Sequence, residues 1–175
     1  MKLHLGCGTK HLDGFTNVDS RNIPEVDIAD DIRSLTRFSD GCAELIYACH
    51  VLEHVGRREY MTVLKRWYDV LQSGGTLRLA VPDFEAVVNH YVKNHNIELV
   101  RGLLWGGQDY PTNYHYIGWD FDRLKSDLEE VGFKNVQRYD RDKTEHAYID
   151  DFSAARIPHM NPQGMLMSLN ISCIK

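Results

Sequence analysis

Two glycines and an aspartate near the start of the chain have the spacing of a nucleoside-binding site. Gly6 and Gly8 flank Cys7 directly after the short apolar stretch 2–5, and Asp19 ends a second stretch of strand type at 15–19. Glycine lets the backbone approach a ligand closely, and a carboxylate at the next strand's end can accept both hydroxyls of a ribose. A tight turn followed by a capping aspartate would look the same, so this pattern alone is weak evidence for a ligand.

A second acidic strand end strengthens the prediction. Asp31 and Ile32 follow residues 26–29, which alternate as a third strand. Ligands of open parallel sheets bind outside the carboxyl ends of the strands, so carboxylates after two successive strands are expected to meet at one cleft. The alternative is that Asp31 caps a short helix.

The segment His50-Val51-Leu52-Glu53-His54 follows an apolar strand at 43–49 and raises the question of a metal. Two histidines four residues apart can share a helix face. The zinc-protease pattern, however, needs glutamate immediately after the first histidine, whereas Glu53 immediately precedes the second, and no third ligand suggests itself nearby. We therefore predict no metal, and assign the segment either to a helix start or to contact with a cofactor or substrate.

Residues 106–118 form an aperiodic stretch rich in glycine and aromatic residues that includes Tyr114 and His115. Loops on a rigid scaffold commonly carry substrate contacts. The alternative is an aromatic surface loop that closes over the core. With the helical patterns at 84–95 and 97–105, this stretch predicts that residues 84–118 are an insert shaping a substrate site.

The order of patterns predicts one α/β domain over residues 1–175. Strands alternate with amphipathic helices, and the stretch between the first two strands is too short for a full crossover helix. We expect a Rossmann-like, mostly parallel sheet of about seven strands with an antiparallel edge strand, and the helix between the first and second strands missing or reduced. Further strands are predicted at 76–81, 133–139 and 165–174, and further helices at 57–71 and 119–131.

Composition narrows the classes of partner. The 175 residues carry a net charge of -5, which disfavours nucleic acid as a partner. The four cysteines form no Cys-x-x-Cys pair, as expected of reduced thiols in a cytoplasmic protein. Neither a membrane span nor a signal peptide is evident.

The spacing also discriminates between two nucleoside cofactors. A dinucleotide needs a helix N-terminus for its pyrophosphate, a third glycine, and the ribose acid about 20 residues further on. Here His11 stands at the third glycine position, and Asp19 lies 11 residues after Gly8 (19 minus 8). S-adenosylmethionine carries no phosphate, so a glycine turn and a ribose acid suffice for it.

The segments 3–8, 17–19, 31–32 and especially 46–54 resemble the class I S-adenosylmethionine-dependent methyltransferases, in a compact bacterial subgroup of the type 11 family. The resemblance covers roughly residues 2–83. It implies that Gly6, Cys7 and Gly8 line the methionine part, Asp19 takes the ribose hydroxyls, Asp31 and Ile32 border the adenine, and His50 and Leu52 face the cofactor. The family's usual third glycine and first helix are missing here, so a partner subunit in a homo-oligomer could cover an open cofactor cleft.

The expected activity is methyl transfer from S-adenosylmethionine to an oxygen or nitrogen of a small-molecule acceptor, with S-adenosylhomocysteine as product. His115 is the first candidate base, with His54 and Asp83 behind it, and Tyr114 could orient the acceptor. The alternative is a non-catalytic S-adenosylmethionine-binding module acting in a complex. An NAD-dependent enzyme is a third hypothesis.

Overall fold

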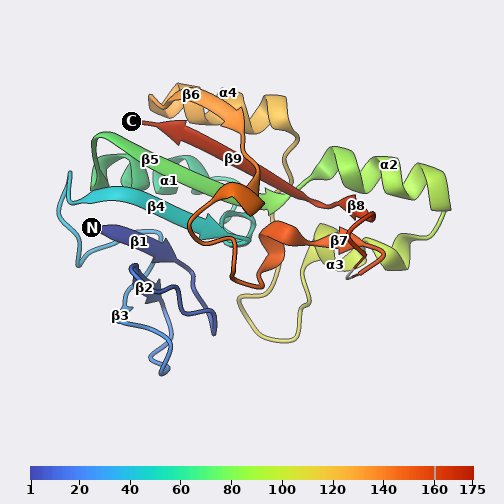
Figure 1. The fold of residues 1–175 in the computed structure, drawn as a ribbon, viewed down its shortest axis with the longest axis horizontal. Coiled ribbons are helices and arrows are strands. Elements are labelled where there is room, and N and C mark those ends of the chain that lie inside the picture. Colours follow the sequence, from blue (N-terminus) through green and yellow to red (C-terminus); the bar gives the residue numbers. More distant parts are fainter. Residues whose placement is uncertain (160) are drawn as a thin grey trace.

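A single twisted sheet organises the chain (Figure 1). The computed structural model describes residues 1–159 and 161–175. The sheet has seven strands in the order β3-β2-β1-β4-β5-β9-β6. Their bounds are β1 Lys2–Leu5, β2 Thr16–Asp19, β3 Ile28–Ala29, β4 Ala43–Cys49, β5 Leu71–Pro82, β6 Lys134–Arg138 and β9 Ser168–Ile174.

Strands β1 to β5 pair in parallel, and β9 runs antiparallel to both of its neighbours, β5 and β6. The predicted α/β, Rossmann-like fold is confirmed, and the expected antiparallel strand is β9, one place inside the edge strand β6. Because the five parallel strands point the same way, their carboxyl ends meet at one edge of the sheet.

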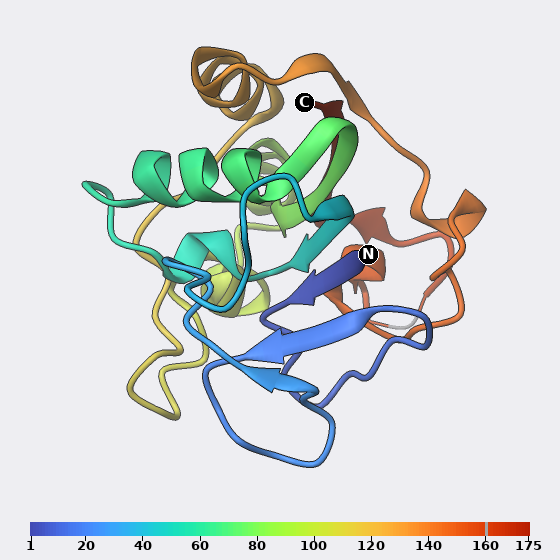
Figure 2. The same ribbon diagram turned by 90° about the vertical axis from the view of Figure 1, so that its left-hand side faces the viewer.

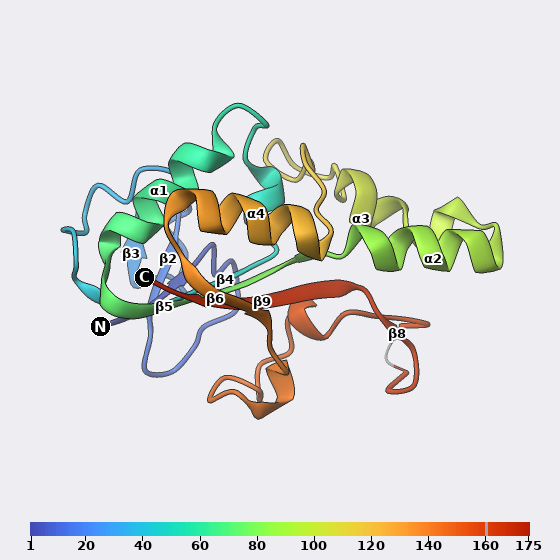
Figure 3. The same cartoon turned by 90° about the horizontal axis from the view of Figure 1, so that it is seen from above.

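Helices α1 (Tyr60–Val70) and α4 (Phe121–Val131) cover one face of the sheet, as Figure 3 shows. Helix α1 buries Tyr60, Leu64 and Trp67, which recur at helical spacing. Helices α2 (Phe84–Asn94) and α3 (Arg101–Trp105) extend beyond the carboxyl end of β5. The predicted helix at 97–105 is a 3₁₀ turn, Ile97–Leu99, followed by α3. In the part of the chain that the structure describes, no helix is long and apolar enough to cross a membrane.

The opposite face has no helix between β1 and β2 in residues 6–15, all of which are described. The mostly irregular C-terminal segment, residues 139–159 and 161–164, covers this face instead, on the side away from α1 and α4 in Figure 2. Ile149 packs there against Leu12, Phe15 and Tyr47. A short hairpin of β7 (Arg156–Ile157) and β8 (Met165–Leu166) ends the segment before β9.

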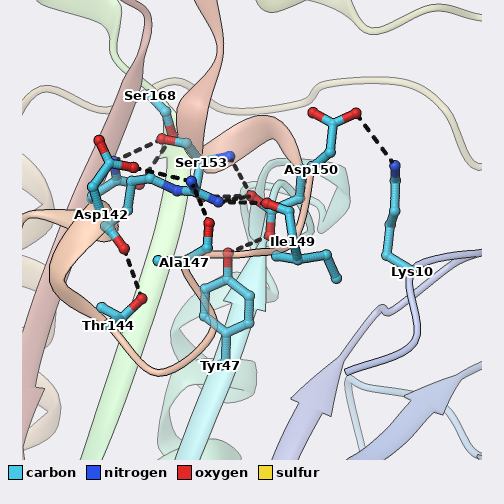
Figure 4. Close-up of polar contacts among 12 residues, drawn as sticks. Lys10, Tyr47, Asp142, Thr144, Ala147, Ile149, Asp150, Ser153 and Ser168 are labelled. Atoms are coloured by element: carbon cyan, nitrogen blue, oxygen red, sulfur yellow. Dashed lines mark hydrogen bonds and ion pairs between the residues drawn. The ribbon is translucent and has the colours of Figure 1, made fainter. Parts of the chain in front are cut away.

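Hydrogen bonds from one arginine hold the C-terminal segment in shape (Figure 4). Arg141 donates to the carbonyls of Ala147 and Ile149, at 2.9 and 2.6 Å, and to Ser153 Oγ at 3.1 Å. Tyr47 Oη of β4 donates to Asp151 at 2.6 Å. The bonds to Ala147 and Ile149 satisfy backbone carbonyls that an irregular segment leaves without helix or sheet partners.

His146 lies in this segment with its ring fully buried. The ring centroid is 4.1 Å from that of Tyr47 and 6.1 Å from that of Phe15, and neither ring nitrogen has a hydrogen-bond partner among the described residues. Burial, with a smaller contribution from Arg78, lowers the pKa of His146 to about 4. The other charged groups that act on the ring are Arg141, Glu145 and Asp151.

His146→Phe is expected to flatten the pH dependence of stability. Below about pH 6.5 the unfolded chain protonates His146 while the folded chain keeps it neutral, so wild type loses stability as pH falls towards about 4. From about pH 8 to about pH 5 the free energy of unfolding of wild type should fall by about 1–2 kcal/mol relative to that of the variant. Urea unfolding of both proteins at each pH measures this difference. His95→Asn, at an exposed left-handed position where asparagine is tolerated, serves as the control. A constant difference between wild type and His146→Phe at all pH values would contradict the assignment.

Candidate active site

A cavity of about 1040 Å³ opens at the carboxyl ends of the parallel strands. This volume is at the upper end of the range for ligand pockets, so it has room for a nucleoside and a second molecule. Residues that follow β1, β2, β3 and β4 all contribute to it. Eight of the predicted site residues line it: Gly6, Cys7, Gly8, Asp19, Asp31, Ile32, His50 and His54.

The glycine turn after β1 has the backbone geometry that the sequence predicts. Gly6 and Gly8 have φ of +63° and +58°, in the left-handed region. A Cβ on Gly6 would lie 2.4 Å from Cγ2 of Val51, which is closer than side-chain contacts allow. The turn therefore needs glycine both for its dihedrals and for the close approach of the segment after β4.

Asp19 lies at the end of β2 with its side chain almost buried. Its Oδ2 accepts from the Gly8 backbone N–H at 2.9 Å, and Oδ1 accepts from Arg21 Nε at 2.9 Å. Burial alone would raise the pKa of Asp19, but the hydrogen bonds from Arg21 and Gly8 outweigh it and lower the pKa. The carboxylate is thus ionised at neutral pH and fixed against the glycine turn.

Asp31 and Ile32 line the same cavity after β3. Asp31 accepts a two-point contact from Arg33, with Arg33 Nη2 2.6 Å from Asp31 Oδ2, and this hydrogen bonding lowers the pKa of Asp31. Ile32 packs against the main core. The pair presents one charged and one apolar side chain at the rim.

The segment after β4 contributes His50, Val51 and His54 to the lining of the cavity. His50 has φ of +51°, and its Nδ1 lies 3.3 Å from Glu53 Oε1. Glu53 begins no regular helix but lies in the 3₁₀ turn Leu52–His54, with none of its surface exposed. Burial raises the pKa of Glu53 to about 8, and burial together with nearby His115 lowers that of His50 to about 3.

Of the predicted catalytic residues, one lines the cavity and the other three do not. His54 lines the cavity, and its Nδ1 donates to the Tyr114 carbonyl at 3.1 Å. His115 lies behind it, edge-on at a ring separation of 4.8 Å, with only 8% of its side chain exposed. Asp83 does not line the cavity, because it caps α2 by accepting from the N–H groups of residues 85 and 86. Leu52 does not line it either, being fully buried in the core.

Comparisons with known proteins agree with this geometry. Residues 11–79 match a family model described as a methyltransferase domain. The match identifies a methyltransferase domain over these 69 of the 175 residues (79 minus 11, plus 1). No curated protein matches the sequence.

Solved structures with the same fold have little sequence in common with this methyltransferase. A SAM-dependent methyltransferase from Archaeoglobus fulgidus is 14% identical with a TM-score of 0.62, over 99% of this chain and 85% of the other. The 1,6-didemethyltoxoflavin-N1-methyltransferase of Burkholderia thailandensis, with bound 1,6-didemethyltoxoflavin and S-adenosylhomocysteine, is 16% identical with a TM-score of 0.60, over 99% and 70%. A Haloferax volcanii protein in complex with the Trm112 methyltransferase activator is 14% identical with a TM-score of 0.57, over 99% and 81%. At these identities the likeness shows the fold alone.

The cofactor of the methyltransferase is S-adenosylmethionine, and the residues at the cavity fit it. Gly6 and Gly8, which have positive φ angles, place no side chain in the cavity beside the ionised carboxylate of Asp19. Arg21 holds that carboxylate here, but its side chain is about half exposed and can move aside for a ribose. Asp31 and Ile32 add one acidic and one apolar side chain to the lining of the same cavity.

The C-terminal segment supplies a wall of the methyltransferase cavity that sequence reasoning missed. Asp150 to Phe152 line it, and Lys10 Nζ in the β1–β2 connection lies 3.9 Å from Asp150 Oδ2 across its mouth (Figure 4). The Phe152 ring is 65% exposed and 5.3 Å from that of His50. The segment has no periodicity and lies far along the chain, so no sequence signal pointed to it.

Proposed function

We propose that this methyltransferase transfers the methyl group to an oxygen or nitrogen of a small-molecule acceptor, releasing S-adenosylhomocysteine. One observation carries the proposal: the glycine turn, Asp19 and Asp31 line the same cavity as His54. One open cavity therefore offers an end for the cofactor and a polar end for the acceptor. The Burkholderia relative, which binds 1,6-didemethyltoxoflavin, is a precedent for a small acceptor on this fold.

The sulfonium is already activated, so the protein has to align the acceptor with the methyl group and receive its proton. His54 is the group that touches the acceptor in this proposal, since it alone of the predicted catalytic residues lines the cavity. His115 supports it from behind, and the Tyr114 carbonyl fixes its ring. Residues Tyr110 and Thr112 of the proposed 84–118 insert also line the cavity and would shape the acceptor end.

Thermal unfolding with added ligand tests the cofactor end. S-adenosylhomocysteine at about 100 times its dissociation constant should stabilise the protein by about 2.7 kcal/mol, which raises Tm by several degrees for a domain of this size. NAD at the same concentration is the control and should give no shift, because His11 stands at the third glycine position and no helix begins in residues 6–15 to bind its pyrophosphate. A shift with NAD alone would contradict the proposed function.

The second candidate is a cofactor-binding module that acts only with a partner, such as a second subunit over the cleft. The missing first helix favours it, as does the exposed apolar surface of α2 and of the turn after it, with Val88, Tyr91, Val92, Ile97 and Leu99. The C-terminal segment, however, already gives this chain a cover of its own. Methyl transfer by the isolated, monomeric chain to any small acceptor, measured alongside its mass in solution, would exclude the second candidate.

A further inference from the structure

Three side chains that can bind a metal ion meet beside the cavity, which one of them, His54, lines. The ligand atoms of Glu53, His54 and His115 all lie within 4.8 Å of one another. The sequence places only two of them together, and the loop 106–118 brings the third from 61 residues further along (115 minus 54). His50 borders the group, with its Nδ1 3.3 Å from Glu53 Oε1.

The buried carboxyl group of Glu53 indicates that a ligand binds here. Its side chain has none of its surface exposed, and neither carboxyl oxygen has a partner with hydrogen-bond geometry among the described residues. A buried polar group without partners is costly, and a buried charge without partners costs more. A cation between Glu53 and the histidines would bond one of these oxygens and neutralise the charge of the carboxylate.

Backbone carbonyls orient the two histidines as ligands. His115 Nδ1 lies 2.9 Å from the carbonyl oxygen of Leu103, and His54 Nδ1 lies 3.1 Å from that of Tyr114. A carbonyl only accepts, so each Nδ1 carries the proton and each Nε2 keeps its lone pair. Histidine ligands in metal sites are typically held by the other ring nitrogen in this way.

The distances suit one small ion after a modest contraction. His115 Nε2 lies 4.0 Å from Glu53 Oε1. A tetrahedral ion with bonds of about 2.1 Å holds its ligand atoms about 3.4 Å apart, so the side chains need to close by about an ångström. Two imidazoles and one carboxylate are a donor set that zinc and related divalent ions accept.

We propose that Glu53, His54 and His115 bind a divalent transition-metal ion, zinc in the first instance, with an open coordination position towards the cavity. The open position follows from burial: Glu53 and His115 are enclosed, whereas His54 lines the cavity. This metal site rests on the proposed function. It restricts the acceptor to molecules whose oxygen or nitrogen can coordinate the ion. A bound ion would hold that atom and ease the loss of its proton, and the histidines then act as ligands rather than as bases.

Metal binding is measured on the full chain without cofactor or acceptor. Chelator-treated protein is titrated with Zn²⁺ by calorimetry and with Co²⁺ by visible absorption. Wild type is expected to bind one equivalent, and the cobalt spectrum should show nitrogen and oxygen ligands without a thiolate charge-transfer band, which separates this site from Cys7 in the same cavity. Glu53→Gln and His115→Gln should each weaken binding at least tenfold, and His95→Asn, an exposed histidine, should not.

Absence of saturable Zn²⁺ and Co²⁺ binding by wild type would overturn the proposal and leave the cluster as a structural network around a protonated Glu53. Binding that both glutamine variants leave unchanged, or a thiolate band, would overturn it as well. The cobalt spectrum of wild type decides the question even where a variant fails to fold. If the protein binds S-adenosylhomocysteine but no metal, only the metal site is refuted. If it binds metal but not S-adenosylhomocysteine, the proposed function is refuted.

Discussion

Asp19→Asn is expected to weaken S-adenosylhomocysteine binding by about 30- to 100-fold. The ionised carboxylate at the end of β2 would accept both ribose hydroxyls, and hydrogen bonds to a charged group contribute about 1.5–3 kcal/mol each. The amide keeps one acceptor oxygen for the Gly8 N–H, which the carboxylate binds at 2.9 Å, but turns a donor towards the second hydroxyl. A loss of about 2.0–2.7 kcal/mol corresponds to the stated change in dissociation constant. Calorimetric titration of both proteins measures it.

Two further variants separate this effect from loss of structure. Asp13→Asn changes an acid in the β1–β2 connection whose side chain is 91% exposed, and should bind as wild type does. Arg21→Gln removes the ion pair that occupies Asp19 and is expected not to weaken binding, because the carboxylate is then free for the ribose. If Asp19→Asn binds as tightly as Asp13→Asn, Asp19 does not hold the cofactor.

The lining of the cavity by Gly6, Gly8, Asp19 and Asp31 could be predicted because its signals are local. Gly6 and Gly8 indicate a turn with positive φ angles. Asp19 and Asp31 mark the ends of strands, which a parallel sheet brings to one edge. These inferences need the order of elements but no knowledge of how helices pack. They therefore hold without the first crossover helix, whose absence the short connection between β1 and β2 also predicted.

The acceptor end depends on contacts between distant segments, which no periodicity encodes. An acid after a strand can point into a cleft or cap the next helix, and Asp83 caps α2. Leu52 turns into the core because residues 52–54 form a 3₁₀ turn rather than the start of a long helix. The meeting of His115 with Glu53, and the wall formed by 150–152, follow from tertiary packing alone.

Gly6→Ala is expected to destabilise the fold by about 2–5 kcal/mol and to abolish cofactor binding. An alanine at φ +63° costs about 1–2 kcal/mol in backbone strain. Its Cβ would also lie 2.4 Å from Val51 Cγ2, and overpacking of this kind typically costs about 1–3 kcal/mol. Relief requires the turn after β1 to move from the segment after β4, and both line the cofactor end. Urea unfolding and S-adenosylhomocysteine titration measure the two effects.

Gly14→Ala is the matched control, because Gly14 has φ of +79° but no atom within 4 Å of the place that an alanine Cβ would take. It should show the strain alone, about 1–2 kcal/mol, so the difference between the two variants isolates the collision. Val51→Ala removes the colliding methyl groups, and the double variant Gly6→Ala/Val51→Ala should cost about 1–2 kcal/mol less than the sum of the single changes. Strict additivity would mean that Val51 does not restrict position 6. Equal losses of unfolding free energy in Gly6→Ala and Gly14→Ala would also mean that Val51 does not restrict position 6. Gly6 would then be needed only for its dihedral angles.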